Sequence, residues 1–105
     1  MPEEVLLQTV REMARAYGYL EFHPYDSRRS TPGFPDCVFV HPVAGRLLFR
    51  ELKTVVGKVT SAQQTWLDGL TAAGQDAAVW RPEDLTSGRI QRELCISRSE
   101  RVGIH

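Results

Sequence analysis

Four residues in the middle of the chain have side chains suited to acid, base or metal chemistry: Asp36, Glu51, Lys53 and Gln63. Glu51 and Lys53 are two residues apart, so on a strand they point to the same face, about 6.6 Å apart. An acid and an amine so placed can bind one metal ion and one reacting phosphate. The alternative is a same-face surface ion pair, which contributes only about 0.5 kcal/mol to stability.

Asp36 joins this pair only if the hairpin between the two predicted strands has the right loop. A four-residue loop after His41 places Asp36 opposite Glu51, and a four-residue loop after Pro42 places it opposite Lys53. A three- or five-residue loop turns Asp36 to the wrong face. The proposed chemistry therefore predicts an even loop. Otherwise Asp36 simply begins a strand after a proline turn.

Two carboxylates that converge need a cation between them, or one of them must change its pKa sharply. Oxygen ligands without Cys or His favour a hard metal such as Mg²⁺ or Mn²⁺. Such a metal can activate water and neutralise charge on a phosphodiester, while Lys53 positions the water or stabilises the pentacovalent state. The three histidines lack metal-ligand spacing and are interpreted as structural or exposed: His23, His41 and His105.

The elements that position these residues follow from the apolar pattern. An amphipathic helix between Pro2 and Gly18 is predicted by apolar residues at spacings of three and four, namely Leu6, Val10, Met13 and Tyr17. Strands are predicted at Tyr19–His23, Asp36–His41, Leu47–Lys53 and Asp76–Trp80. Helices are predicted from Thr60 to Ala73, with Trp66 in the core, and over Thr86–Leu94.

Thr60 and Gln63 form a capping box at the start of the second helix, which is an alternative role for Gln63. The strands before and after that helix are expected to be parallel, joined by a right-handed crossover. The order α-β-β-β-α-β predicts an α/β fold with a mixed central sheet. The length indicates one domain.

Composition excludes several classes of protein. The 13 basic and 13 acidic residues balance, which argues against gripping nucleic acid through bulk positive charge but allows a local basic patch. No apolar run is long enough for a membrane span, and the acidic start lacks the features of a signal peptide. Two cysteines are too few for a disulfide scaffold or a four-ligand zinc site, so a cytoplasmic protein is expected.

A series of short motifs in order along the chain resembles the PD-(D/E)XK nuclease superfamily, and most closely its VRR-NUC branch. The motifs are Gly33-Phe-Pro-Asp36, Phe49-Arg-Glu-Leu-Lys53, Gly57-Lys58, Ser61-Ala-Gln63 with Trp66-Leu67, and Val79-Trp80-Arg81-Pro82. The resemblance implies a restriction-endonuclease-like core, with the nuclease domain at 1–94 and a C-terminal tail at 95–105.

The same resemblance implies roles for individual residues. Asp36, Glu51 and the backbone carbonyl of Leu52 would bind the metal, with Lys53 as the catalytic lysine and Gln63 facing the site. The family also places an acid in the first helix, four residues before a Gln. Here that acid is Glu4, before Gln8, with Glu3 as the weaker candidate.

Small members of this branch, often phage-encoded, resemble Holliday junction resolvases of DNA recombination and repair. The resemblance therefore implies a Mg²⁺-dependent DNA endonuclease, acting as a homodimer on branched DNA such as four-way junctions. Arg28, Arg29 and Lys58 are expected to contact DNA phosphates. Two alternatives remain: a nuclease subunit that depends on a partner complex, and a DNA-binding module with a decayed site.

Overall fold

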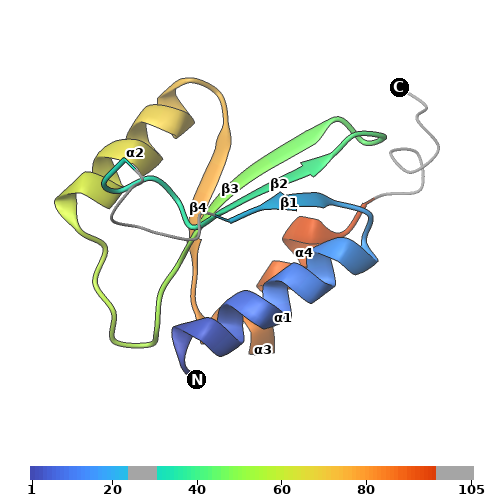
Figure 1. Cartoon of the computed structure of the whole chain (residues 1–105), viewed down its shortest axis with the longest axis horizontal. Coiled ribbons are helices and arrows are strands. Elements are labelled where there is room, and N and C mark those ends of the chain that lie inside the picture. Colours follow the sequence, from blue (N-terminus) through green and yellow to red (C-terminus); the bar gives the residue numbers. More distant parts are fainter. Residues whose placement is uncertain (24–30, 97–105) are drawn as a thin grey trace.

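The computed structural model, which describes residues 1–23 and 31–96, has a mixed four-stranded sheet with helices on both faces (Figure 1). The elements are α1 (Glu3–Ala16), β1 (Leu20–Phe22), β2 (Cys37–His41), β3 (Arg46–Leu52), α2 (Ser61–Ala72), β4 (Asp76–Trp80), α3 (Pro82–Thr86) and α4 (Arg89–Leu94). The sheet order is β1-β2-β3-β4, antiparallel except for the parallel β3–β4 pair. The expected restriction-endonuclease-like α/β core is confirmed. None of the described helices is both long and apolar enough to cross a bilayer.

The β2–β3 hairpin has the first of the two even registers predicted from the sequence. His41 pairs with Arg46 across the four-residue loop 42–45, and Cys37 pairs with Arg50. One residue further along the two strands, Asp36 lies opposite Glu51. The alternation also sends Cys37 to the opposite face from Asp36, where it is buried.

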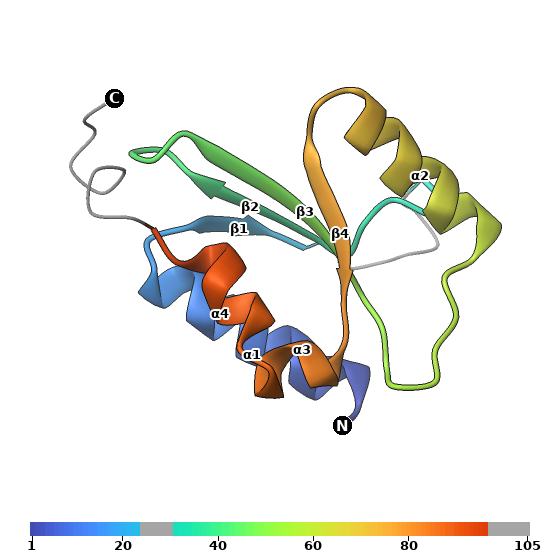
Figure 2. The ribbon, with the colours of Figure 1, turned by 180° about the vertical axis from the view of Figure 1, so that it is seen from behind.

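The main core lies between the sheet and the pair α1 and α4, which cover the same face (Figures 1 and 2). The sheet contributes alternating apolar residues from adjacent strands: Cys37, Phe39, Leu48, Leu52 and Trp80. α1 contributes Leu6, Val10 and Ala14. The sequence pattern predicts that Met13 and Tyr17 are in the core, but both are only partly buried at its edge. Ala14 is fully buried instead. The small Ala side chain allows the helix to lie close to the strands.

A buried arginine joins α4 to the sheet. Arg50 alternates with Glu51 and so points into the core, where only 1% of it is exposed. Its guanidinium donates to Asp76 Oδ1 (2.8 Å) and Glu93 Oε1 (3.0 Å) and lies 5.0 Å from the centre of the Trp80 ring. Carboxylates and an aromatic face thus replace the water that a buried cation loses.

Two predicted elements differ in the structure. The helix expected over Thr86–Leu94 begins only at Arg89, as α4, because Gly88 before it adopts a left-handed φ of +82°. The short helix α3 that precedes it was not predicted. β1 is shorter than the predicted strand because Tyr19 turns into the core, where its hydroxyl donates to the carbonyl of Leu94 (2.9 Å).

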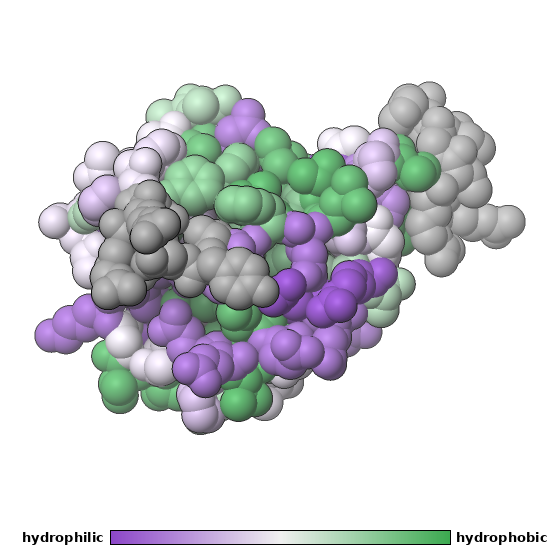
Figure 3. All heavy atoms as spheres, viewed as in Figure 1, coloured by the Kyte–Doolittle hydropathy of each residue, from purple (hydrophilic) through white to green (hydrophobic). Residues whose placement is uncertain are grey.

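The second face of the sheet is only partly covered. Figure 2 shows α2 on this face, beside β4. Trp66 is half-buried rather than in the main core, and its ring packs edge-on against Phe34. Towards β1, large apolar side chains remain exposed, and we refer to them as the apolar sheet face: Leu20, Phe22, Val40 and Leu47. Hydrophobic atoms gather over this region of the sheet in Figure 3.

Candidate active site

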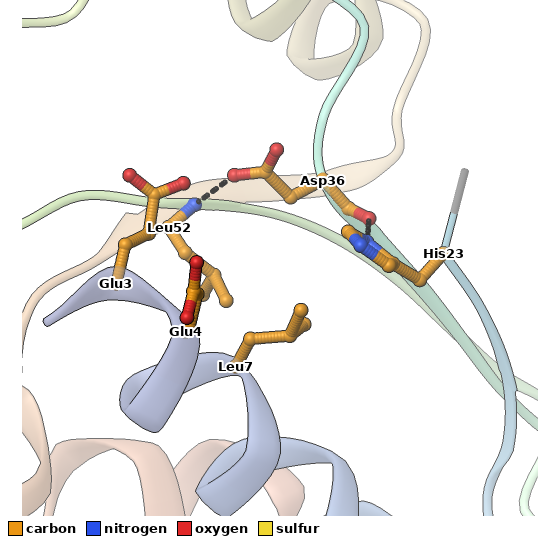
Figure 4. Close-up of a pocket in the computed structure, with 6 residues that line it drawn as sticks. All are labelled: Glu3, Glu4, Leu7, His23, Asp36 and Leu52. Carbon is orange, nitrogen blue, oxygen red and sulfur yellow. Dashed lines mark hydrogen bonds between the residues drawn. The ribbon is translucent and has the colours of Figure 1, made fainter. Parts of the chain in front are cut away.

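Asp36, Glu51, Lys53 and Gln63 come together at the end of β3, between the N-terminal ends of α1 and α2. The backbone N–H of Leu52 donates to Asp36 Oδ2 (2.9 Å), which holds the start of β2 to the end of β3 (Figure 4). Gln63 Nε2 donates to Glu51 Oε2 (2.8 Å), and Lys53 Nζ lies 3.4 Å from the same oxygen. The structure therefore joins the four residues that the sequence singled out.

The carboxylate of Glu51 is in an environment that disfavours its charge. Only 3% of its side chain is exposed. Burial, and then the nearby Asp36, raise the pKa of Glu51 to about 7, although Lys53 acts to lower it. Within residues 1–23 and 31–96, the buried Oε1 of Glu51 has no hydrogen-bond partner. The pair of acids is thus short of positive charge, and one carboxylate oxygen is available for a ligand.

Gln63 fills both roles that the sequence left open. Its backbone N–H donates to Thr60 Oγ1 (3.1 Å), and its Oε1 accepts from the backbone N–H of Thr60 (2.9 Å). The amide nitrogen of the same side chain reaches Glu51. The capping box therefore fixes the orientation of the amide that meets the carboxylate.

Gly33 allows α2 to approach the segment that leads into Asp36. Its φ is +87°, and a Cβ at this position would lie 2.4 Å from the carbonyl carbon and oxygen of Ala62. Such a contact with backbone atoms is sterically excluded. The Gly33-Phe-Pro segment therefore packs directly on the first turn of α2, with Phe34 against Trp66. This close packing brings Gln63 within reach of the strand ends.

The acids of α1 also reach the site. Glu3 and Glu4 line a pocket of about 360 Å³ together with Leu7, His23, Asp36 and Leu52 (Figure 4). Burial and the charge of Asp36 raise the pKa of Glu3, while Lys53 and His23 oppose this. Glu4 lies opposite the apolar stripe of the helix. It reaches the pocket because the end of α1, rather than its side, lies over the strand ends.

His23 is a pocket residue that sequence analysis missed. Its Nδ1 donates to the backbone carbonyl of Asp36 (2.8 Å), so it ties the end of β1 to the start of β2. No spacing in the sequence points to this contact, because it depends on the pairing of β1 with β2. His41, by contrast, is buried and structural, bonded to the carbonyl of Tyr17 and the N–H of Ala44.

The predicted phosphate-binding residues are only partly described. Lys58 is exposed on the loop between β3 and α2, next to the site along the chain. Arg28 and Arg29 lie outside the described residues.

The donor set fits a hard divalent cation with few protein ligands. No group of three or more His, Cys, Asp and Glu side chains within 1–23 and 31–96 has the geometry to hold a metal. Two carboxylates are nevertheless typical of Mg²⁺, which keeps several waters and takes further oxygens from phosphate. A cation beside Glu51 would give Oε1 a partner and would oppose the raised pKa of that carboxyl.

The chain also matches a known protein family. Residues 1–83, which include every residue of the site, match the family model described as the VRR-NUC domain. No curated protein and no solved structure matches the chain.

Proposed function

Because the chain belongs to the VRR-NUC family of PD-(D/E)XK nucleases, we propose that it is a Mg²⁺-dependent endodeoxyribonuclease that cuts branched DNA, with four-way junctions as its preferred substrate. The proposal rests on one observation. Asp36, Glu51 and Lys53 lie together at the end of β3, and Gln63 donates a hydrogen bond to Glu51.

Each residue of the site has a distinct task. Asp36 and Glu51, with the backbone carbonyl of Leu52, hold Mg²⁺, for which Mn²⁺ can substitute. The bound ion supplies a Lewis acid that lowers the pKa of water and neutralises charge on the phosphate. The ammonium of Lys53 orients the attacking water or donates to the phosphoryl oxygen that gains charge. Gln63 engages Oε2 of Glu51 and leaves Oε1 for the cation.

The pocket beside the metal ligands gives α1 a part in the reaction. Glu4, and with it Glu3, can accept hydrogen bonds from water held between the helix and Asp36. The raised pKa of Glu3 indicates that a proton is easily held there. We therefore assign the pocket to the water that takes part in hydrolysis.

A homodimer is the second part of the proposal. One chain carries one such site, whereas resolving a four-way junction takes two matched cuts, and a two-fold dimer supplies two sites in symmetric positions. The apolar sheet face offers a surface for the second copy. A nuclease subunit within a larger complex is the alternative, which the balanced net charge favours because the chain lacks bulk attraction for DNA.

The metal assignment is tested by removing each carboxylate. Asp36→Ala and Glu51→Ala should each lower the cleavage rate in Mg²⁺ by at least about a hundredfold, because ligand loss removes the ion that stabilises the developing charge. Binding of the same DNA in Ca²⁺ should remain. Glu83→Gln is the control, since Glu83 is an exposed acid on α3. If either alanine variant cuts at the wild-type rate, the assignment is wrong.

A further inference from the structure

The turn that follows β3 exposes two adjacent apolar side chains. Val55 is 62% exposed and Val56 is 85% exposed, the highest value among the large hydrophobic residues that the structure describes. The two valines occupy the corners of a tight turn, in which the N–H of Gly57 donates to the carbonyl oxygen (3.3 Å) and Oγ1 (3.0 Å) of Thr54. In Figure 1 this loop extends away from the sheet towards the N-terminus, and hydrophobic atoms lie over the same region in Figure 3.

Folding gives no reason for valines at these corners. Asn, Asp, Gly, Pro and Ser are the residues that favour tight turns, whereas β-branched residues favour strands. Neither Val55 nor Val56 belongs to the hydrophobic core. Water contacts both side chains, so their contribution to stability is small. Their presence points to a ligand with an apolar surface.

Hydrogen bonds from residues outside the turn hold it in place. Arg81 Nη1 donates to the carbonyl oxygens of both Thr54 and Gly57, each at 2.7 Å. The backbone N–H of Lys53 donates to the carbonyl of Trp80 (3.0 Å), which anchors the start of the loop to β4. The two valines are therefore presented in a preformed arrangement, so little conformational entropy is lost when they bind.

The position of the turn relates it to the scissile phosphate. Three Cα–Cα links separate Val56 from Lys53, so the two Cα atoms are at most about 11 Å apart. The side chain of Lys53 runs beside this turn, since a Cβ at Gly57 would lie 3.5 Å from Lys53 Cδ. The turn can therefore contact nucleotides next to a phosphate held at Lys53. The exposed Lys58 directly follows the turn in the sequence, and its ammonium is free to meet a phosphate in solution.

We propose that Val55 and Val56 form a wedge that inserts between bases beside the cut, and that this wedge makes the enzyme select branched DNA. The inference rests on the nuclease function proposed above and names its substrate selectivity. Apolar side chains that enter a base step must unstack it, which is costly in a continuous duplex. At a branch point the stacking is already interrupted, so the wedge binds there at lower cost than in linear DNA.

The test compares a double variant, Val55→Ser with Val56→Ser, with the control Val43→Ser. Val43 is also exposed (53%) but lies in the β2–β3 turn, at the opposite end of these strands from the site. The first readout is the fluorescence of 2-aminopurine at the branch point of a four-way junction, with Ca²⁺ in place of Mg²⁺ so that no cleavage occurs. The second is the ratio of Mg²⁺-dependent cleavage rates on the junction and on a linear duplex of the same sequence.

With wild type and Val43→Ser we expect fluorescence to rise on binding, because unstacking relieves the quenching of 2-aminopurine. The double variant should lose this rise and reduce the junction-to-duplex rate ratio at least about fivefold, while its rate on linear duplex stays within about twofold. An unchanged ratio and fluorescence in the double variant would overturn the wedge. Equal loss of both rates would also overturn it, since the turn would then serve the site itself.

Failure of the proposed function gives a different pattern. If the wild type cuts no DNA in Mg²⁺, the proposed nuclease fails, but the fluorescence rise in Ca²⁺ still decides whether the valines insert. If the wild type produces no rise, the wedge is wrong whether or not the enzyme cuts. If the double variant changes the molecular mass measured by light scattering, the turn is a protein contact and the wedge is also wrong.

Discussion

For Lys53, a substitution by Arg keeps the positive charge and changes only the shape of the charged group. The ammonium of Lys53 lies 3.4 Å from Glu51, and its side chain is mostly buried beside the acids. Lys53→Ala should lose most cleavage activity while Mn²⁺ binding, measured by calorimetry, is retained. Lys53→Arg should not restore the rate, because a planar guanidinium cannot replace a compact point charge that serves one oxygen. Lys58→Arg is the control, since Lys58 is exposed. Full activity of Lys53→Arg would remove the proposed role.

The convergence of Asp36, Glu51 and Lys53 could be predicted because it depends on local rules. Glu51 and Lys53 share a face through the two-residue period of a strand, and the loop parity then places Asp36 opposite Glu51. The capping box predicted the place of Gln63 in the first turn of α2, whereas its approach to Glu51 was implied by the family resemblance. Glu3 and His23 were less accessible to prediction, because their places depend on how separate elements converge around the pocket.

At the scale of elements, Gly33 decides how closely α2 can lie to the strands. Gly33→Ala forces a Cβ to within 2.4 Å of the backbone of Ala62, in addition to the strain of a positive φ. Gly74→Ala is a matched control: its φ is +82°, yet a Cβ there has no atom within 4 Å. We expect the control to lower the free energy of unfolding by about 1 kcal/mol, the usual cost of a left-handed conformation.

Gly33→Ala should cost clearly more than this control, about 3 kcal/mol or more, since backbone must move to relieve the overlap. It should also reduce cleavage, because Gln63 moves away from Glu51 when α2 is displaced. Urea unfolding and cleavage rates measure both effects. Equal losses of stability in Gly33→Ala and Gly74→Ala would mean that the approach of α2 is not limited by this position.

The contact between α4 and the sheet should depend on pH through Glu93. Burial alone would raise the pKa of Glu93, but hydrogen bonds from Trp80 and Arg89 and the charges of Arg50 and Arg89 outweigh it and lower the pKa. A carboxyl whose folded pKa lies below its unfolded value contributes stability above the unfolded pKa, about 4.3 for Glu, and loses it as the pH falls through the folded value.

Glu93→Gln should therefore destabilise the protein at pH 7, and the difference from wild type should shrink as the pH falls below about 4.3. Thermal unfolding over a series of pH values measures this. Glu12→Gln on the exposed side of α1 is the control and should show no such trend. A difference that stays constant down to acid pH would show that the charge of Glu93 is not what stabilises the contact.

The secondary structure followed from periodicity more readily than the packing did. Strand alternation predicts β2, β3 and β4 within one residue at each end. The burial of Arg50 was not predictable, because its partners Asp76 and Glu93 are distant in the sequence. The break between α3 and α4 depends on the positive φ of Gly88. A glycine permits such a φ but does not require it, so the sequence alone does not predict the break.

At the scale of the whole molecule, the apolar sheet face belongs neither to the hydrophobic core nor to the candidate site. If a fully exposed large apolar side chain presents about 200 Å², Leu20, Phe22, Val40 and Leu47 together expose roughly 400 Å². Patches of this size commonly mark interaction sites. The four side chains lie on paired strands of the sheet rather than on a projecting turn, and they carry no charge that could meet DNA phosphates or a charged partner. The same face of a second copy is complementary, and a two-fold axis would bring the two faces together.

Such a dimer also places two nuclease sites relative to each other. Leu47 and Glu51 lie on the same face of β3, four residues or about 13 Å apart. A two-fold axis near Leu47 therefore brings both sites to the border of the interface. A branched duplex lying across that border can meet both sites in one complex.

Leu47→Glu tests this arrangement, because a buried glutamate on each side of the axis would oppose pairing. Light scattering should give about twice 11.9 kDa for the wild type and about 11.9 kDa for the variant. Val5→Glu, an exposed position on α1, is the control and should remain dimeric. On a plasmid with an extruded cruciform, the dimer should make paired cuts that linearise the DNA, and the variant should leave nicked circles. A wild-type monomer at micromolar concentration that cuts linear and branched DNA equally would leave the nuclease chemistry standing and remove the junction-resolving dimer.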